Sequence, residues 1–418
     1  MQKKNWKRNI ILYLTSQTIS LFGSMLVQYA MSWHIVLETQ SATMMTVSIL
    51  CGFLPAFFVS PFAGVWADRY NRKLLIILSD AIIALATLFV AAAFMYGYRE
   101  IWLIFVVMAV RGIGQGVQQP AVGAMIPRLV PEDKLMKINA ANSTVQSIMM
   151  LASPVLAASL LAVASIESIF FIDVITAAIA ILILALFLRV DSDEQSEKVR
   201  QGGYFEDFIS GLKYIRRHSF VKQLFVFCIV FYLMAGPSAF LSPLQVTRLF
   251  GSDTMRLSSI EAAFSAGMIA GGILMMLWGG FKNRHSSLTL GLFAYAAGTM
   301  ILGLLPLFWV YIAVMFILGV SMPVFNTPFM VIMQEKIEPE YLGRVLGFLG
   351  MLSSIGMPMG MLVFGPLADI IDLNLIFIGT GGVMLISSIV LRFNKSLIEA
   401  GKPLTTENKG VRSNPVSE

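Results

Sequence analysis

The chain has 418 residues, of which 57% are hydrophobic and 13% are charged, and its formal net charge is +6. Soluble domains average about 25% charged residues, so this composition excludes an ordinary water-soluble globular protein. A mean hydropathy of +0.78 agrees with that exclusion and favours a chain that lies mostly inside a membrane.

Twelve apolar runs are long enough to cross a bilayer, which requires about 20 mainly apolar residues per helix. The first run follows a basic N-terminus but is longer than a signal-peptide core and lacks a small-residue cleavage site, so we expect it to be retained. The predicted spans are residues 11–36, 43–66, 74–96, 101–125, 138–163, 166–189, 221–247, 258–281, 287–305, 308–333, 344–368 and 373–391.

Basic residues are distributed unevenly between alternate loops. With a cytoplasmic N-terminus, 26 of the 30 Lys and Arg residues fall in cytoplasmic segments. Only Arg99, Arg248 and Arg256 fall in outside loops, and Arg111 lies within a span. Because Lys and Arg favour the cytoplasmic side, we predict a multi-pass protein of the cell membrane with both termini in the cytoplasm. This orientation also accounts for the pI of about 9.2 without a nucleic-acid partner.

One long polar stretch separates the sixth and seventh spans. It opens with an acidic segment, 191–197, and from Tyr204 onward apolar residues recur at helical spacing beside Lys213, Arg216 and Arg217. That pattern predicts a short amphipathic helix at the cytoplasmic interface. The predicted domains are an N-terminal six-helix half at 1–190, a cytoplasmic linker at 191–220, a C-terminal six-helix half at 221–392 and a disordered cytoplasmic tail at 393–418.

A weak internal repeat relates the two halves. A shift of 208 residues aligns Pro120 with Pro328, and a shift of 212 aligns Arg72 with Arg284. Each match falls at the corresponding span or loop of its half. We therefore expect an all-α integral membrane fold of twelve helices in two pseudo-symmetric six-helix bundles.

The loop after the second span reads Gly64-Val-Trp-Ala-Asp68-Arg69-Tyr-Asn-Arg72-Lys73. It resembles G-x-x-x-D-R-x-x-R-R/K, the loop motif of the major facilitator superfamily. The resemblance implies a secondary transporter in which these five motif residues form a gate that latches the halves in the outward-facing state. Physically, Gly64 is expected to let two helices approach closely. The alternative is a plain basic cluster of the kind that any cytoplasmic loop can carry.

Arg111 lies about ten residues into the fourth span, where an arginine costs at least about 2.5 kcal/mol, so we expect it to face a wet cavity or a partner. Gln115, Gln118 and Gln119 follow at helical spacing and extend a polar stripe. The run Arg111-Gly-Ile-Gly-Gln-Gly116 resembles the fourth-helix motif of the same family, which implies a role for Arg111 in proton coupling. The alternative is a structural arginine bound to backbone carbonyls.

Acidic residues inside the spans are further candidates for proton coupling, because burial away from water favours an uncharged carboxyl group. We rank them Asp173, then Glu261, then Asp80. The depth of Asp173 in its span is similar to that of Arg111, which makes a pair between them possible. Asp80 and Glu261 are predicted to lie closer to the interface, where simple solvation also explains them.

Polar side chains at helical spacing mark candidate cavity-lining positions on other spans. Such amides and hydroxyls also join helices to one another, so the two interpretations stand side by side. The candidates are Gln17, Ser20, Ser24 and Gln28 on the first span, Gln115, Gln118 and Gln119 on the fourth, and Asn142 and Gln146 on the fifth. Ser153 and Pro154 fall where exporters of the family carry a Gly-Pro motif, and they predict a helix break, although this sequence departs from the motif.

The chain carries no nucleotide-binding P-loop, no HExxH sequence and no redox-cysteine motif, so we expect neither an ATP-driven pump nor an enzyme. Its two cysteines fall in apolar runs, and its three histidines lack metal-ligand spacing. We therefore predict no metal and no cofactor. The expected partners are a small-molecule substrate, protons and the lipid bilayer, with no nucleic acid, and the protein is expected to be a monomer.

Three further runs, Gly52-Phe-Leu-Pro55, Val130-Pro-Glu132 and Ile172-Asp-Val174, resemble the macrolide-efflux branch of bacterial facilitator proteins. This resemblance implies proton-coupled efflux of an amphiphilic compound such as a macrolide by alternating access. One alternative is export of an endogenous metabolite or a siderophore. A membrane sensor or scaffold that transports nothing is the alternative from a different class.

Overall fold

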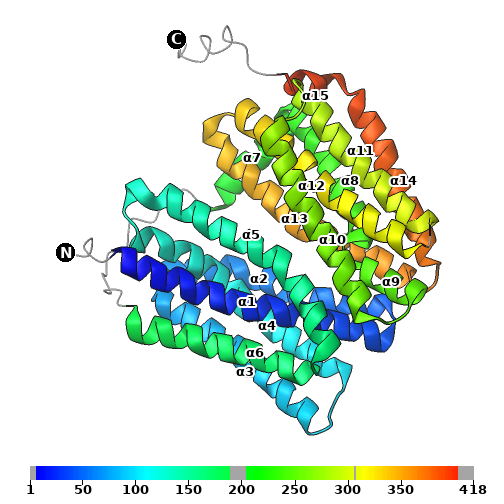
Figure 1. Ribbon diagram of the computed structural model, residues 1–418. Helices are drawn as coiled ribbons and strands as arrows, with labels where there is room; N and C mark the ends of the chain where they lie inside the picture. Colours follow the sequence, from blue (N-terminus) through cyan, green and yellow to red (C-terminus); the bar gives the residue numbers. More distant parts are fainter. Residues whose placement is uncertain (1–5, 189–203, 306, 403–418) are drawn as a thin grey trace. The chain divides into compact units, whose positions relative to one another are not determined.

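The computed structural model describes residues 6–188, 204–305 and 307–402, and within them it leaves out a few side chains, that of Asp68 among them. All regular elements in this part of the chain are helices (Figure 1). They are α1 (Trp6–Thr39), α2 (Ala42–Arg69), α3 (Arg72–Met95), α4 (Ile101–Leu129), α5 (Glu132–Val163), α6 (Ile166–Leu182), the π-helical turn η2 (Ile183–Phe187), α7 (Tyr204–Arg217), α8 (Ser219–Phe240), α9 (Ser242–Phe250), α10 (Thr254–Trp278), α11 (Arg284–Leu304), α12 (Phe308–Lys336), α13 (Pro339–Leu367), α14 (Leu373–Arg392) and α15 (Lys395–Ala400).

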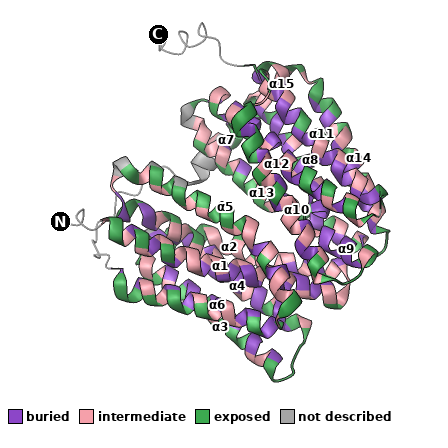
Figure 2. Ribbon diagram, viewed as in Figure 1, coloured by how far each residue is buried: buried purple, intermediate pink, exposed green. Residues whose placement is uncertain are grey.

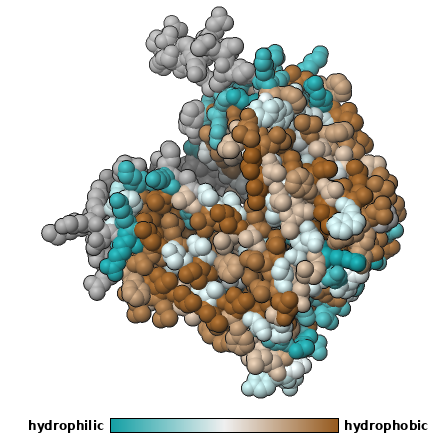
Figure 3. Space-filling view, in the orientation of Figure 1, coloured by the Kyte–Doolittle hydropathy of each residue, from teal (hydrophilic) through white to brown (hydrophobic). Residues whose placement is uncertain are grey.

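Twelve stretches of helix in the described residues are long and apolar enough to cross a membrane, which confirms the predicted fold class. Each of them follows one predicted span; the sixth, Ile166–Phe187, combines α6 with η2, and the seventh, Ser219–Phe250, combines α8 with α9. A helix satisfies its own backbone hydrogen bonds, which a bilayer core cannot do for it. Hydrophobic residues make up most of the surface seen in Figure 3, and hydrophilic residues form smaller separate groups on it.

Short polar residues begin many of these helices. Asn71, for example, accepts hydrogen bonds from the backbone N–H groups of Lys73 and Leu74 and so starts α3 directly after α2. Ser41 does the same for α2. Such caps satisfy N–H groups that have no partner within the helix. They allow consecutive spans to be joined by only two residues at these points.

The chain divides into two compact units, one comprising Met1–Arg200 with Val246–Ser259 and the other Gln201–Gln245 with Ile260–Glu418. In the first unit, α4 packs against α2 and α3, while α6 packs against α1 and α3. In the second, α11 packs against α12 and α14, and α8 packs against α13 and α14. Buried residues lie where these helices face one another (Figure 2). The predicted limits of the two halves and of the linker stay predictions.

The segment at 393–418, for which disorder is predicted, begins instead with helix α15. Asn394 caps this helix, and the Gly401 carbonyl accepts a hydrogen bond of 3.0 Å from the backbone N–H of Arg284. These contacts order a polar segment that has no apolar run of its own. The acidic linker segment at 191–197 and the rest of the tail from residue 403 lie outside the described residues.

Candidate functional site

Arg111 lies at the centre of the first unit and is 0% exposed. Its guanidinium forms an ion pair with Asp173 of α6, donates a hydrogen bond to the Thr87 hydroxyl of α3, and donates another, of 3.0 Å, to the Ser24 carbonyl of α1. One arginine of α4 therefore contacts three other helices. The structure brings together the two residues, Arg111 and Asp173, for which the sequence made a pair possible.

Asp173 is as completely enclosed as its partner. The Ser24 hydroxyl donates to its Oδ1 at 3.0 Å, and the Thr87 hydroxyl lies 2.8 Å from its Oδ2. Removing two charges from water costs several kcal/mol per ion, and good pairing with additional hydrogen bonds offsets that cost. Here every oxygen of the carboxylate has a polar partner, whereas the Arg111 Nε has none among the described residues.

Asp80 of α3 forms a second buried acidic site in the same four-helix core. It is 1% exposed, so the alternative that it is simply solvated is wrong. The Ser20 hydroxyl of α1 donates to Asp80 Oδ1 at 2.5 Å, and the Gln118 amide of α4 donates to the same oxygen at 2.7 Å. Asp80 Oδ2 has no hydrogen-bond partner in the described part of the chain. No cation contacts this carboxyl group among the described residues.

Two of the four residues in the predicted polar stripe of α1 bind these two acids. Ser20 binds Asp80 and Ser24 binds Asp173, so both hydroxyls hold acids within the helix core. The Gln17 amide nitrogen is buried without a partner among the described residues. Gln28, one helical turn beyond Ser24, is half-buried beside Gly52 of α2.

The residues of the predicted stripes on α4 and α5 differ in how far they are buried. Gln118 reaches Asp80, Gln115 is half-buried, and Gln119 is exposed. On α5, Asn142 is half-buried and Gln146 is exposed, and neither joins the acidic core of Asp80 and Asp173 in the described structure.

The predicted helix break at Ser153 and Pro154 is also wrong, because α5 runs through both residues without interruption. Proline removes one backbone donor, yet a helix still satisfies the remaining backbone groups better than an irregular segment would inside a membrane. Ser153 is fully buried, and its hydroxyl has no partner among the described residues.

The loop motif places its cations on the ends of neighbouring helices. Arg72 donates hydrogen bonds of 2.7 Å to the Ala67 carbonyl of α2 and of 2.7 Å to the Ala124 carbonyl of α4. Lys73 donates to the carbonyls of Ala185 and Leu188, at 3.2 and 2.7 Å, where η2 ends. Cations at helix C-termini bind carbonyl groups that lack partners within the helix. The start of α3 is thus tied to the ends of three helices.

Other motif residues behave differently. Arg69 is exposed, and the side chain of Asp68 lies outside the described residues. Within its own unit, no described atom lies within 4 Å of the position that a Cβ would take on Gly64, and the expectation that this glycine lets two helices approach stays a prediction.

The glycines that do permit close approach are those that follow Arg111. A Cβ on Gly112 would meet the Gly52 carbonyl, and one on Gly116 would meet the backbone of Ala56, both on α2. Gly114 faces Ile83 of α3 in the same way. The glycine run therefore lets α4 pack tightly between α2 and α3, which positions Arg111 beside its partners.

In the second unit, Glu261 of α10 is half-buried, and the described residues supply neither a hydrogen bond nor an ion pair to its carboxyl group. It is separate from the acidic core of the first unit. A nearby polar network was not predicted from the sequence: Gln245 donates to Asn374 at 2.8 Å and accepts from the Tyr311 hydroxyl at 3.0 Å.

A cavity of about 310 Å³ in the second unit was also missed. Aromatic side chains from α8 and α12 line it together with Asn326 and Ser353, a lining of mixed polarity. One feature of the sequence indicated this cavity: Asn326 is a polar residue in the middle of an apolar span. The structure shows that its side chain is exposed. The aromatic residues that line the cavity are Tyr232, Phe325 and Phe329.

No group of three or more His, Cys, Asp or Glu side chains in the described residues could hold a metal ion. Cys51 and Cys228 are free thiols.

Twelve stretches of helix in the described residues, each long and apolar enough to cross a membrane, define an integral membrane protein. The family model of the Major Facilitator Superfamily matches residues 13–361, and the chain belongs to this superfamily. The chain is therefore a multi-pass membrane transporter.

Its curated relatives include efflux proteins. Macrolide efflux protein A of Streptococcus pyogenes is 31% identical over 388 residues, which cover 92% of this chain and 96% of that protein. Macrolide efflux protein A of Enterococcus faecalis is 32% identical over 323 residues, or 77% of this chain and 99% of that protein. The chain is thus related to macrolide and drug efflux pumps.

Solved structures support the fold. A bacterial homologue of the iron transporter ferroportin, in an inward-facing state, superposes with a TM-score of 0.68 at 15% identity, over 95% of this chain and 99% of that chain. The nucleoside transporter NupG gives a TM-score of 0.65 at 13% identity, over 93% of this chain and 98% of that chain.

Proposed function

We propose that the chain is a proton-coupled exporter of an amphiphilic small molecule, such as a macrolide, that works by alternating access. Similarity to macrolide efflux protein A over 92% of this chain supports the substrate class and the direction of transport. The concentration of Lys and Arg in alternate loops supports a cytoplasmic location for both termini.

The observation that carries the coupling mechanism is the environment of Asp80. Protonation of Asp173 would break a buried ion pair with Arg111, whereas Asp80 contacts only the neutral side chains of Ser20 and Gln118 among the described residues. Asp80 can therefore gain and lose a proton without leaving an arginine unpaired. We place it ahead of Asp173 and Glu261 as the proton carrier, which reverses the ranking made from the sequence.

Asp80 also links the helices whose packing must change when a proton binds. Its one bonded oxygen accepts from α1 and from α4, so a change of charge alters the strength of two interhelical hydrogen bonds at once. Hydrogen bonds to an ionised acceptor are roughly twice as strong as bonds between neutral groups. The ionised form therefore holds α1, α3 and α4 together more firmly than the protonated form. The Arg111–Asp173 pair holds the same bundle whichever state Asp80 adopts.

The aromatic cavity of the second unit supports an amphiphilic substrate. Ligand sites combine a mainly apolar lining with a few polar groups, and their volumes start near 300 Å³. At about 310 Å³ the cavity would hold one apolar portion of a larger compound, with Asn326 and Ser353 available for hydrogen bonds.

Cellular accumulation of a labelled macrolide tests the proposal. Overexpression is expected to lower accumulation and deletion to raise it, and Asn326→Ala is expected to weaken the effect of overexpression several-fold. Phe316→Ala is the matched control, since this side chain lies on the same helix, is 40% exposed and does not line the cavity. Unchanged accumulation across a broad panel of amphiphilic compounds would refute the export of such molecules.

A further inference from the structure

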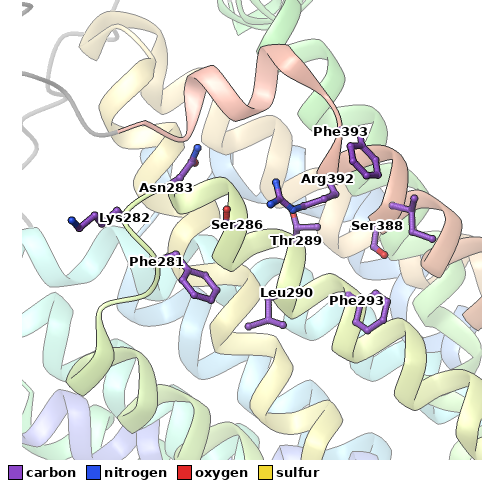
Figure 4. A pocket seen from close by; sticks show the side chains of 11 residues that line it. Phe281, Lys282, Asn283, Ser286, Thr289, Leu290, Phe293, Ser388, Arg392 and Phe393 are labelled. Carbon is purple, nitrogen blue, oxygen red and sulfur yellow. The ribbon is translucent and has the colours of Figure 1, made fainter.

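A second and larger cavity, of about 760 Å³, lies within the second unit where α11 begins and α14 ends (Figure 4). It is separate from the aromatic cavity, with which it shares no lining residue. It also lies outside the acidic core that is proposed to carry the proton. Because both helices reach the membrane surface at this end, the cavity sits at the level of lipid headgroups.

Two cations mark the upper part of this cavity. Arg392, at the end of α14, points across it towards Thr289, whereas Lys282, in the loop before α11, lies at the rim with its side chain directed away from Arg392 (Figure 4). Both residues are exposed, and neither forms an ion pair within the part of the chain that the structure describes. No acidic residue is among those that line the cavity. The site is therefore complementary to an anion.

Hydroxyl groups lie beside the cations. Thr289 and Ser388 direct their protons to carbonyls of their own helices, at 2.7 and 2.8 Å, so each keeps lone pairs that face the cavity as acceptors. The Ser286 hydroxyl has no partner among the described residues and remains available as a donor. Donors and acceptors thus occur together at the charged end.

Below this end the lining becomes apolar. Leu290 and Phe293 continue along α11, and Ile389 lies opposite them on α14 (Figure 4 labels the first two). With a rise of about 1.5 Å per residue, Phe293 lies roughly 10 Å deeper along the helix than Ser286. All three apolar side chains are about half exposed, on a span surface that a bilayer covers. Charge at the membrane surface with apolar surface beneath it matches the two ends of a phospholipid.

The charged end is held in a fixed shape by its own loop and by the chain that follows α14. Gly279 and Gly280 have φ values of +69° and +81°, which turn the chain sharply into α11. The Phe281 backbone N–H then donates to the Ser287 hydroxyl at 2.7 Å. The Asn283 amide donates to the Ile398 carbonyl at 3.1 Å, which ties this loop to α15. A preformed site loses less conformational freedom when a ligand binds.

We propose that this cavity binds one anionic phospholipid from the leaflet at this end of the helices. Its phosphate binds Arg392, the flexible Lys282 side chain turns from the rim to pair with it as the second cation, and an acyl chain follows Leu290 and Phe293. Basic pockets between transmembrane helices are the sites that bind anionic headgroups. A free phosphate ion would use the cations and leave the apolar half of the cavity empty.

Native mass spectrometry of the purified full-length protein tests this site, with phosphatidylglycerol and phosphatidylcholine of the same acyl chains added in equal amounts. We expect the wild type to retain phosphatidylglycerol preferentially. Lys282→Gln with Arg392→Gln is expected to lower that retention on the order of 10- to 30-fold, since each basic residue near a membrane surface contributes about a fivefold factor. Ser286→Phe, which fills the cavity and keeps both charges, should lower it as well.

The matched control is Arg216→Gln with Lys222→Gln, which removes the same two charges from exposed positions of the same unit. It is expected to bind lipid as the wild type does. Three results would overturn the proposal: equal retention of both lipids, the same loss in the control as in the cavity variant, or complete displacement of the lipid by millimolar inorganic phosphate. The last result would show a site for soluble anions.

Discussion

The Arg111 guanidinium and the Asp173 carboxylate are each other's only counter-charge among the described residues, and water does not reach either of them. Such a pair contributes little net stability compared with apolar side chains of similar size, yet the loss of one partner leaves an uncompensated charge. The Arg99–Glu167 pair offers a contrast at the end of the same bundle, because its arginine is 65% exposed.

Asp173→Asn is expected to lower the free energy of unfolding by roughly 3–5 kcal/mol, since asparagine keeps the hydrogen-bond acceptor but removes the counter-charge of Arg111. Thermal unfolding of the purified protein in detergent measures the effect. Glu167→Gln is the control and should cost less than about 1 kcal/mol, as solvent screens an exposed pair. Equal losses in the two variants would show that burial of the pair has no energetic consequence.

Arg111 could be identified from the sequence because an arginine inside an apolar run is costly wherever its helix packs. The burial of Asp80 could not, because it depends on Ser20 and Gln118, which approach from two other helices. The position of a residue along one span predicts its depth in the membrane, but it does not predict which side chains of other helices bury that residue. The aromatic cavity could not be predicted for the same reason, because its lining residues come from three helices, α8, α12 and α13.

At the scale of elements, glycines decide which helices touch. Gly112 and Gly116 of α4 face the backbone of α2, and Gly267 and Gly319 do the same between α10 and α12 of the second unit. The sequence indicated the glycine run of α4, but it did not show which neighbour the run serves. Gly64 has no such contact within its own unit, so its expected role in helix packing stays a prediction.

Gly112→Ala is expected to destabilise the protein by about 1–3 kcal/mol, because the new methyl group meets the Gly52 carbonyl and forces α2 and α4 apart. Gly123→Ala on the same helix is the control: no described atom lies within 4 Å of its Cβ position, so the change should be neutral or stabilising by up to about 1 kcal/mol. Thermal unfolding distinguishes them. A Gly123→Ala variant as unstable as Gly112→Ala would contradict the packing argument.

The repeat between halves, weak in sequence, has a structural counterpart at one pair of residues. Arg72 at the start of α3 binds the end of α4 through the Ala124 carbonyl, and Arg284 at the start of α11 binds the end of α12 through Glu335. The shift of 212 residues aligned these two arginines. Each joins the third span of its half to the end of the fourth, with a carbonyl as the acceptor in one half and a carboxylate in the other.

At the scale of the whole molecule, hydropathy was sufficient to predict twelve spans, because an apolar run of that length has few alternatives to a helix in a membrane. Helix α15 could not be predicted from the sequence, because it is only six residues long and depends on contacts with α11 rather than on its own composition. The side of the membrane on which the termini lie rests on loop charge alone.

Labelling of single cysteines tests that orientation, in a background with Cys51 and Cys228 replaced by serine. Tyr98→Cys, in the exposed turn between α3 and α4, should react with a membrane-impermeant maleimide on intact cells. Lys395→Cys, exposed at the start of α15, should react only after the cells are made permeable. The reverse pattern would place both termini outside the cytoplasm.

Flux of a labelled macrolide into proteoliposomes that contain the purified protein, with an acidic lumen and a neutral exterior, tests the central claim most directly. We expect the wild type to concentrate the compound while the pH gradient lasts. Asp80→Asn should fail to concentrate it yet still exchange labelled for unlabelled compound without a gradient, because it loses the proton carrier and keeps the Arg111–Asp173 pair. Two results would contradict proton-coupled export through Asp80: an Asp80→Asn variant that concentrates the compound as well as the wild type does, or a wild-type flux that is the same with and without the pH gradient.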